Sequence, residues 1–173
     1  MSAAAADAGT TVLVPMSEAT YARYVESAVA GYAEDSVACG RWPAAGALER
    51  SRREFAALLP QGLATPDNHL CEIRDGRTQE SVGAIWFAVV ADEGDRAAYV
   101  YDVVVEPPHR RRGHALRAFE ALEERVRALG LSRIGLHVFG HNPGAQALYA
   151  RLGYGVTGIN MVKQLDAAAR PAA

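Results

Sequence analysis

The sequence predicts an α/β fold with a mixed, mostly antiparallel twisted sheet flanked by helices. Three β-rich runs, at residues 69–74, 82–90 and 97–105, follow one another with short turns between them, as in an antiparallel meander. A helical pattern then leads to a fourth strand-like run at 132–140. A helical crossover of this kind joins parallel strands, so the third and fourth runs should form one parallel pair.

Length and composition favour one domain. The chain has 173 residues, half of them hydrophobic, which is enough for one full core and short for two. We expect a single domain over residues 11–166. The Ala-rich stretches at 1–10 and 167–173 should form a disordered N-terminal tail and a flexible C-terminal tail.

The charge balance and the cysteines restrict the possible partners. Eighteen Lys and Arg face twenty Asp and Glu, giving a formal charge of -2, so no global basic field is available for nucleic acid or an anionic membrane. Cys39 and Cys71 are far apart, have no metal-ligand spacing and fit a reducing compartment. With no signal-peptide pattern and no apolar run of about 18 residues, we expect a cytoplasmic protein without metal.

The region before the meander contains a strand and two helices. A strand-like run at 11–15 comes first, and Ser17 can cap a helix that continues to about Cys39 and ends at Gly40. A second helix is expected from near Pro43 until the turn-rich stretch at 60–68. Its inward-facing residues should be Leu48, Phe55, Leu58 and Leu59.

The region after the meander contains two further helices. The first should run from Gly113 to Gly130, with an inward stripe formed by Leu116, Phe119, Leu122, Val126 and Leu129. The second has Asn142 as its N-cap, Pro143 at its first position and Gly153 at its end. Two short strands are expected to follow within 155–165.

Arg110, Arg111 and Arg112 stand where the third strand run gives way to a helix. Such a strand–loop–helix junction suits phosphate, because the unpaired N–H groups of the first turn and the helix dipole attract anions. Gly113 would let a diphosphate approach the backbone, although the spacing is neither GxxxxGK[ST] nor GxGxxG. A nucleic-acid patch is disfavoured, because no aromatic residues interleave the arginines. A solvated turn and a phosphate site both remain open.

Two longer stretches carry a family resemblance. The segment "VVVEPPHRRRGHALRAFEALEERVRALG" resembles motif A of the GNAT superfamily of acyl-CoA-dependent N-acyltransferases, with Arg110, Gly113 and Ala115 at the positions that bind the coenzyme A pyrophosphate. The segment "IGLHVFGHNPGAQALYARLGY" resembles motif B, with Asn142, Tyr149 and the closing Leu-Gly-Tyr at 152–154. The element order resembles the superfamily from about residue 12 to 165. The chain departs from many members in having Arg111 and Ala115 in place of Gly.

The resemblance implies splayed central parallel strands with acetyl-CoA between them and coenzyme A as product. The donor would lie between the strand ending near Val105 and the strand at 133–139, where its pantetheine amides would pair with strand backbone. Asn142 is equally explained as a helix cap. The expected donor contacts are Val103 and Val105 through their backbone, and Arg110, Arg111, Arg112, Gly113, His114, Ala115, Asn142, Ala145 and Tyr149.

Acyl transfer to an amine requires a proton acceptor for the amine and a proton donor for the thiolate. The resemblance implies Tyr149 as the donor; the alternative is a core tyrosine with a satisfied hydroxyl. Asp102, expected on the same strand face as Val100 and Val104, is a candidate base or else the acceptor of a structural hydrogen bond. His137 and Glu72 are further candidates, with a core role and a solvent-facing role as their alternatives, and a water chain could also suffice.

We therefore predict an N-acetyltransferase that acts on a primary amine by direct attack in a ternary complex, since no Ser or Cys nucleophile elbow is present. The alternative is a non-catalytic acyl-CoA-binding module. The acceptor, a small molecule or a peptide or protein, would bind near Trp42, where Tyr32 and Glu49 could line its pocket or belong to the core. A homodimer is possible by family habit.

Overall fold

The computed structural model describes residues 10–92 and 94–163, so apart from Thr10 the two expected tails lie outside the described residues. Two short 3-10 helices, Gly62–Ala64 and Pro107–His109, join longer elements. In chain order these are β1 (Thr11–Pro15), α1 (Glu18–Ala38), α2 (Ala47–Leu58), β2 (Asn68–Asp75), β3 (Ser81–Asp92), β4 (Asp95–Val105), α3 (His114–Ala128), β5 (Ile134–Leu136) and α4 (Pro143–Arg151).

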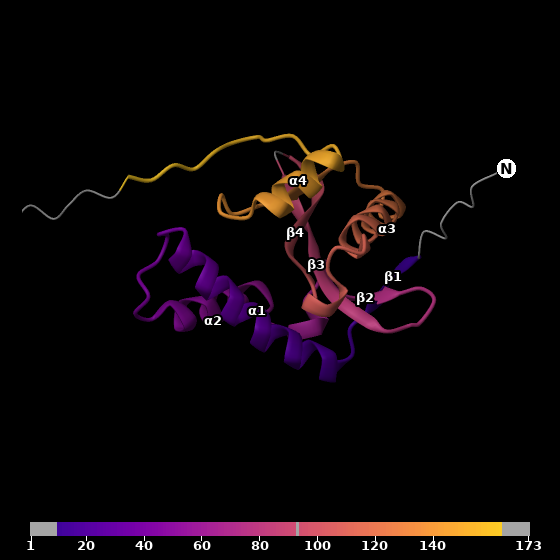
Figure 1. Ribbon diagram of the computed structural model, residues 1–173, viewed down its shortest axis with the longest axis horizontal. Coiled ribbons are helices and arrows are strands. Elements are labelled where there is room, and N and C mark those ends of the chain that lie inside the picture. The colour runs from indigo at the N-terminus through magenta and orange to yellow at the C-terminus, as the bar shows by residue number, and fades with distance from the viewer. Residues whose placement is uncertain (1–9, 93, 164–173) are drawn as a thin grey trace, which may run out of the picture.

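One five-stranded sheet organises the molecule, in the order β1-β2-β3-β4-β5. All neighbouring pairs are antiparallel except β4 and β5, which are parallel. Helix α3 lies on one side of the sheet, and α1 and α2 lie on the other (Figure 1). This arrangement confirms the predicted fold class, including its single parallel pair.

Two apolar clusters hold the layers together. On the α3 side, Phe119 and Leu122 pack on Ile85 and Phe87 of β3, and none of these four side chains is exposed to solvent. On the other side, Trp86 belongs to the cluster formed with α1 and α2. Because alternate residues of a strand face opposite sides of a sheet, β3 supplies both cores.

The helix ends follow local chemistry closely. The hydroxyl of Ser17 accepts a hydrogen bond from the Thr20 amide, as expected of an N-cap. Gly40, Gly130 and Gly153 have positive φ angles after their helices, which glycine adopts without steric cost. None of the described helices combines the length and apolarity needed to cross a membrane.

The second helix differs from its prediction. It begins at Ala47 rather than near Pro43, because Gly46 directly before it adopts a left-handed conformation with φ of 76°. Phe55 and Leu59 are buried as expected. The other two expected inward residues, Leu48 and Leu58, are 42% and 37% exposed.

The far end of the α3 stripe and the C-terminal strands were also predicted wrongly. Leu129 is the C-cap of α3 and is 45% exposed. The strand expected at 132–140 is paired only over Ile134–Leu136. Within the described part of the segment expected to form two strands, residues 155–163, the chain has no regular structure. A strand needs a neighbour, and among the described residues none pairs with this segment.

Candidate active site

The site begins with an irregularity in β4. Val100 pairs with Phe87 and Asp102 pairs with Trp86, so two adjacent residues of β3 oppose three of β4, and Tyr101 is the extra residue of a β-bulge. Val100 accordingly packs in the α3-side core, whereas Val104 packs in the core of α1 and α2. The sequence prediction that Asp102 shares a face with both valines was therefore wrong, because the bulge reverses the alternation.

The bulge also changes the direction of the backbone. Before it, the Ala98 amide donates to the Arg133 carbonyl beside β5 at 3.0 Å. Beyond Val100, β4 has no further pairing with β5. Alternation past the bulge directs the N–H and C=O of Val103 and Val105 toward this opened side, as the 2.8 Å bond from Arg110 Nε to the Val105 carbonyl illustrates. The two valines proposed from sequence thus present backbone groups where the parallel strands part.

The loop after β4 forms a positively charged turn. Arg110, Arg111 and Arg112 are exposed, and Arg111 adopts a left-handed conformation with φ of 62°. Gly113, with φ of 82°, is the N-cap of the 15-residue helix α3. Free amides in the first turn, the helix dipole and the arginines together suit a diphosphate.

Arg117, one turn into α3, organises this junction. Its guanidinium donates to the Arg112 carbonyl at 2.9 Å and to the Thr11 hydroxyl at 3.1 Å. A Cβ atom at Gly113 would lie 2.6 Å from its Nη1 atom. Arg117 was not among the site residues expected from the sequence. Its position four residues after Gly113, on the same face of the helix, could have indicated that its side chain reaches the loop.

His114 and Ala115 begin the helix that follows this loop. The His114 ring is 5% exposed and lies 3.3 Å from the Thr11 hydroxyl, so this side chain faces the interior. Burial, together with the nearby charge of Arg117, lowers the pKa of the His114 imidazole. Only the backbone amide of His114 is therefore suited to meet an anion at the loop, and Ala115 has no polar side chain to add.

Asp102 lies beyond the bulge and contacts α1. The hydroxyl of Tyr24, itself 7% exposed, donates to Asp102 Oδ2 at 2.9 Å. Burial raises the pKa of the Asp102 carboxyl; the charge of Asp35 acts in the same direction, while hydrogen bonds from Tyr24 and the Val103 amide oppose the shift. A carboxylate with an elevated pKa is better matched to accept a proton near neutral pH.

Tyr149 extends from α4 into the α3-side core. Its ring packs on Phe119, with centroids 5.3 Å apart, and its side chain is 8% exposed. Burial, with a contribution from the charge of Asp102, raises the pKa of Tyr149 to about 12, so the phenol stays protonated through neutral pH. No donor or acceptor among the described residues pairs with its hydroxyl, which leaves that group available to a ligand.

The other two candidate bases have different surroundings. His137 is exposed and has an edge contact with the Phe139 ring at 5.1 Å. Glu72 is 4% exposed, forms an ion pair with Arg74 at 3.2 Å and accepts from the Thr20 hydroxyl at 3.3 Å. Although burial acts to raise the pKa of Glu72, hydrogen bonds from Arg74 and other neighbours lower it overall. Glu72 is therefore a structural carboxylate rather than a solvent-facing one.

Asn142 is the N-cap of α4, because its Oδ1 atom accepts from the Ala145 amide at 3.1 Å. This bond occupies both the Asn142 side-chain oxygen and the Ala145 N–H. The capping alternative for Asn142 is thus present in the structure. A ligand could therefore contact Asn142 and Ala145 only through atoms other than the Asn142 Oδ1 and the Ala145 N–H.

Aromatic residues gather on the side where the acceptor was expected. Tyr32 contacts both Trp42, at 5.4 Å between centroids, and Phe139, at 6.3 Å. Arg41 lies over the first two of these rings, within 5.7 and 5.3 Å of their centroids. Glu49, by contrast, is an exposed residue of α2 paired with Arg52. The structure therefore joins Tyr32 and Trp42 but leaves Glu49 apart.

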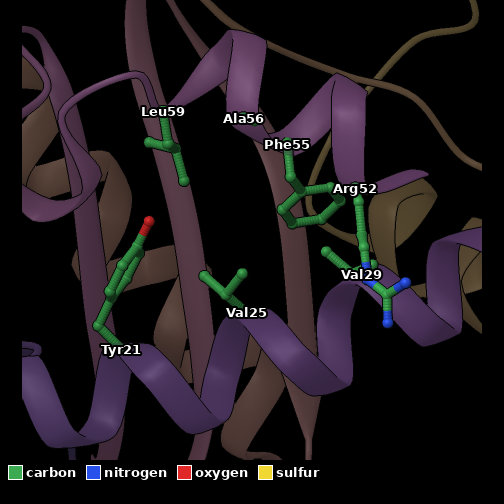
Figure 2. Close-up of a pocket in the computed structure, with 7 residues that line it drawn as sticks. All are labelled: Tyr21, Val25, Val29, Arg52, Phe55, Ala56 and Leu59. Atoms are coloured by element: carbon green, nitrogen blue, oxygen red, sulfur yellow. The ribbon is translucent and has the colours of Figure 1, made fainter. Parts of the chain in front are cut away.

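A separate pocket of about 270 Å³ lies between α1 and α2. Figure 2 shows an apolar lining with the Tyr21 hydroxyl at one end and the Arg52 guanidinium at the other. Neither Asp102 nor Tyr149 lines it. This pocket is consequently distinct from the cluster that carries the candidate acid and base.

Comparison with known proteins agrees with this geometry. The chain matches the Acetyltransferase (GNAT) family over residues 36–154. It is 33% identical over 156 residues to the uncharacterized N-acetyltransferase YycN of Bacillus subtilis (strain 168), covering 90% of this chain and 99% of YycN. The uncharacterized N-acetyltransferase YdgE of the same organism is 30% identical over 153 residues, covering 88% and 97% of the two chains.

Solved structures show the same relationship. The crystal structure of YycN superposes with a TM-score of 0.85, again over 90% of this chain and 99% of that one. The aminoglycoside antibiotic 6'-N-acetyltransferase AAC(6')-Ih of Acinetobacter baumannii, only 15% identical, has a TM-score of 0.54 over 91% and 99% of the chains and shares the fold alone. The predicted family and enzyme class are confirmed: the chain belongs to the GNAT acetyltransferase family.

Proposed function

We propose that this protein transfers an acetyl group from acetyl-CoA to a primary amine by direct attack in a ternary complex. One observation supports the proposal: the charge of Asp102, beyond the last β4 residue paired with β5, adds to burial in raising the pKa of the Tyr149 phenol. A carboxylate can accept the proton of the attacking amine, and a protonated phenol can donate a proton to the leaving thiolate.

The acetyl donor would lie along the opened side of β4. Its amides would pair with the Val103 carbonyl and the Val105 N–H, which have no strand partner on that side, and its diphosphate would rest on the turn at 110–113 and the first amides of α3. The absence of a side chain at Gly113 supports this placement, because a Cβ there would meet the Arg117 guanidinium at 2.6 Å.

The reaction needs two proton transfers. The amine nitrogen forms a bond to the thioester carbonyl carbon, and Asp102 accepts the proton that this nitrogen loses, directly or through a water molecule. The carbon–sulfur bond then breaks, and Tyr149 donates its phenolic proton to the departing thiolate. Products are the acetylated amine and coenzyme A, and exchange of protons with water restores both side chains.

The donor site can be tested by calorimetric titration with acetyl-CoA. Gly113→Ala should weaken binding at least about tenfold, because the new Cβ displaces Arg117 and crowds the turn. Gly130→Ala is a matched control: Gly130 ends the same helix with φ of 76°, but a Cβ there would meet nothing within 4 Å. Equal affinities of the two variants would contradict the placement at the turn.

The acid can be tested by steady-state kinetics with a panel of primary amines. Tyr149→Phe keeps the ring packed on Phe119 and removes the proton donor, so kcat should fall about 10²-fold while acetyl-CoA affinity stays near the wild-type value. Unchanged turnover would remove Tyr149 from the mechanism. If the wild type binds acetyl-CoA but acetylates no amine, a non-catalytic acyl-CoA-binding module becomes the better description.

A further inference from the structure

One face of helix α1 connects the candidate base to the loop that joins β5 to α4 (Figure 1). The Tyr24 hydroxyl donates to Asp102 at 2.9 Å, and farther along the helix Asp35 Oδ1 lies 2.8 Å from His141 Nε2 in that loop. From Tyr24 to Asp35 the helix rises about 16 Å, and the two residues lie within about 20° of each other around its axis. This face of α1 therefore runs from the second half of β4 to the loop.

Gly31 lies between these two residues on the same face of α1. It is an interior residue of a helix that extends over Glu18–Ala38, where glycine is destabilising relative to alanine. A Cβ atom at Gly31 would meet nothing within 4 Å, so no neighbouring group requires the missing side chain. The helix thus has open space on this face, where a ligand can approach the backbone closely.

Each end of this open stretch has a carboxylate without an arginine or lysine partner among the described residues. Asp102 receives hydrogen bonds from the Tyr24 hydroxyl and the Val103 amide. Asp35 is 50% exposed and meets His141 through Oδ1, so its Oδ2 atom can bind a further cation. Burial is the main cause of the raised pKa of Asp102, and the Asp35 charge adds to it, which indicates that the two carboxylates affect each other.

Aromatic rings lie beside the contact between Asp35 and His141. Phe139 stacks on His141, with centroids 5.3 Å apart, and also contacts the Tyr32 ring. The guanidinium of Arg41 lies 5.7 Å from the Tyr32 centroid, which shows that this group of rings accommodates a cation. Arg41 has its own acidic partner on α2, so the Asp35 end of the group remains for a cation from outside the chain.

We propose that Asp35 selects the acceptor, and that the acceptor is a short linear diamine. One amine reacts beside Asp102, the other pairs as an ammonium with the Asp35 carboxylate, and the aliphatic chain between them crosses the open space at Gly31. Because the contact between Asp35 and His141 closes the far end of this path, a short molecule with a cation at each end fits it better than a polypeptide. This inference rests on the acetyl transfer proposed above.

Calorimetric titration of amines into the full chain, with and without saturating coenzyme A, tests the pairing without requiring turnover. Diaminobutane should bind the wild type at least about tenfold more tightly than butylamine, which has the same carbon chain and one cation fewer. Asp35→Asn keeps the shape of the side chain and removes its charge, so the two affinities should come within about twofold of each other. Glu34→Gln, at the neighbouring exposed carboxylate, is the matched control and should retain the preference.

A leucine at position 31 tests the path of the aliphatic chain. Gly31→Leu should raise the melting temperature, because leucine favours a helix and its Cβ atom meets nothing within 4 Å. The same variant should weaken diaminobutane binding at least about tenfold, because the leucine fills the open space. Ala22→Leu, at an exposed position of the same helix, is the control and should leave the affinity unchanged. A glycine that served only the fold would not combine higher stability with lower affinity.

Kinetics separate this inference from the proposed function. The ratio of kcat/KM for diaminobutane to that for butylamine should be at least about tenfold in the wild type and close to unity in Asp35→Asn. Acetylation of both amines with equal efficiency would overturn the inference and leave the proposed acetyl transfer standing. Preferential binding of diaminobutane without acetylation of any amine would support the Asp35 site and contradict the transfer.

Three binding results would overturn the inference. A wild type that binds neither amine would do so, as would a preference for diaminobutane that survives Asp35→Asn. Tighter binding of a lysine-containing peptide than of diaminobutane would show instead that the acceptor is a polypeptide.

Discussion

The two halves of β4 differ in what surrounds them. From Asp95 to Val100 the strand pairs with β3, from Ala98 onward it also pairs with β5, and its inner side chains belong to the core. From Asp102 to Val105 only β3 remains as a neighbour, and a half-buried carboxylate takes the place of an apolar side chain. The bulge at Tyr101 separates the halves. One strand can therefore stabilise the fold with its first half and leave backbone groups without a strand partner in its second.

The largest expected difference between the two halves of β4 is the loss of activity when the Asp102 carboxylate is removed. Asp102→Asn keeps the shape of the side chain but cannot accept the amine proton, so kcat/KM should fall about 10²–10⁴-fold. Asp95→Asn changes an exposed carboxylate at the other end of the same strand and should have no effect. Steady-state kinetics at saturating acetyl-CoA measures both, and equal activities would end the functional distinction between the halves.

A substitution in the first half of β4 should change the stability of the protein rather than its activity. Val100 is 4% exposed within the α3-side core, so Val100→Ala should lower the free energy of unfolding by about 1–3 kcal/mol. Urea denaturation gives this value. Per folded molecule, kcat should stay within about twofold, since the side chain faces α3 and not the gap. A large loss of kcat with unchanged stability would reverse the assignment of the two halves.

Much of this architecture could be predicted because periodicity and turn residues act locally. The meander, the caps at Ser17 and Asn142 and the loop glycine Gly113 all follow from patterns a few residues long. The bulge could not be found in this way, because an unbroken β-rich run gives no sign of an extra residue in one strand of a pair. Its consequence, the reversed face of Asp102, was therefore mispredicted.

The partner of Asp102 also depends on tertiary structure. Tyr24 was not among the residues expected at the site, yet its hydroxyl meets a carboxylate 78 positions later in the chain. A buried tyrosine hydroxyl in an apolar stripe does require some partner, and this rule was the available signal. The segment 155–163 was mispredicted for a related reason: its sequence favours strands, but no strand of the described residues pairs with it.

The hydrogen bond from Tyr24 to Asp102 should affect the pH dependence of kcat/KM. Because this bond lowers the pKa of Asp102 against the effect of burial, Tyr24→Phe should raise that pKa further and move the ascending limb of the kcat/KM profile to higher pH. The loss at neutral pH should be a few-fold. Tyr21→Phe, on the same helix but lining the α1–α2 pocket, should leave the limb in place. An unshifted limb in Tyr24→Phe would show that Tyr24 does not position the titrating base.

The smallest expected effect is a gain in stability, whereas the other substitutions should each cause a loss of activity or stability. Burial raises the pKa of Asp102 above its unfolded value, so the folded state binds more protons than the unfolded state between the two pKa values, and stability falls as pH rises through this window. Asp102→Asn removes the ionisation. The variant should therefore be more stable than the wild type at neutral pH, and the gain should vanish when the pH falls below the unfolded pKa of aspartate. Thermal melts of both proteins across this range measure the difference. A variant that gains stability while losing turnover would mean that the second half of β4 keeps a costly carboxylate for catalysis, whereas a loss of stability at neutral pH would make Asp102 a structural partner of Tyr24.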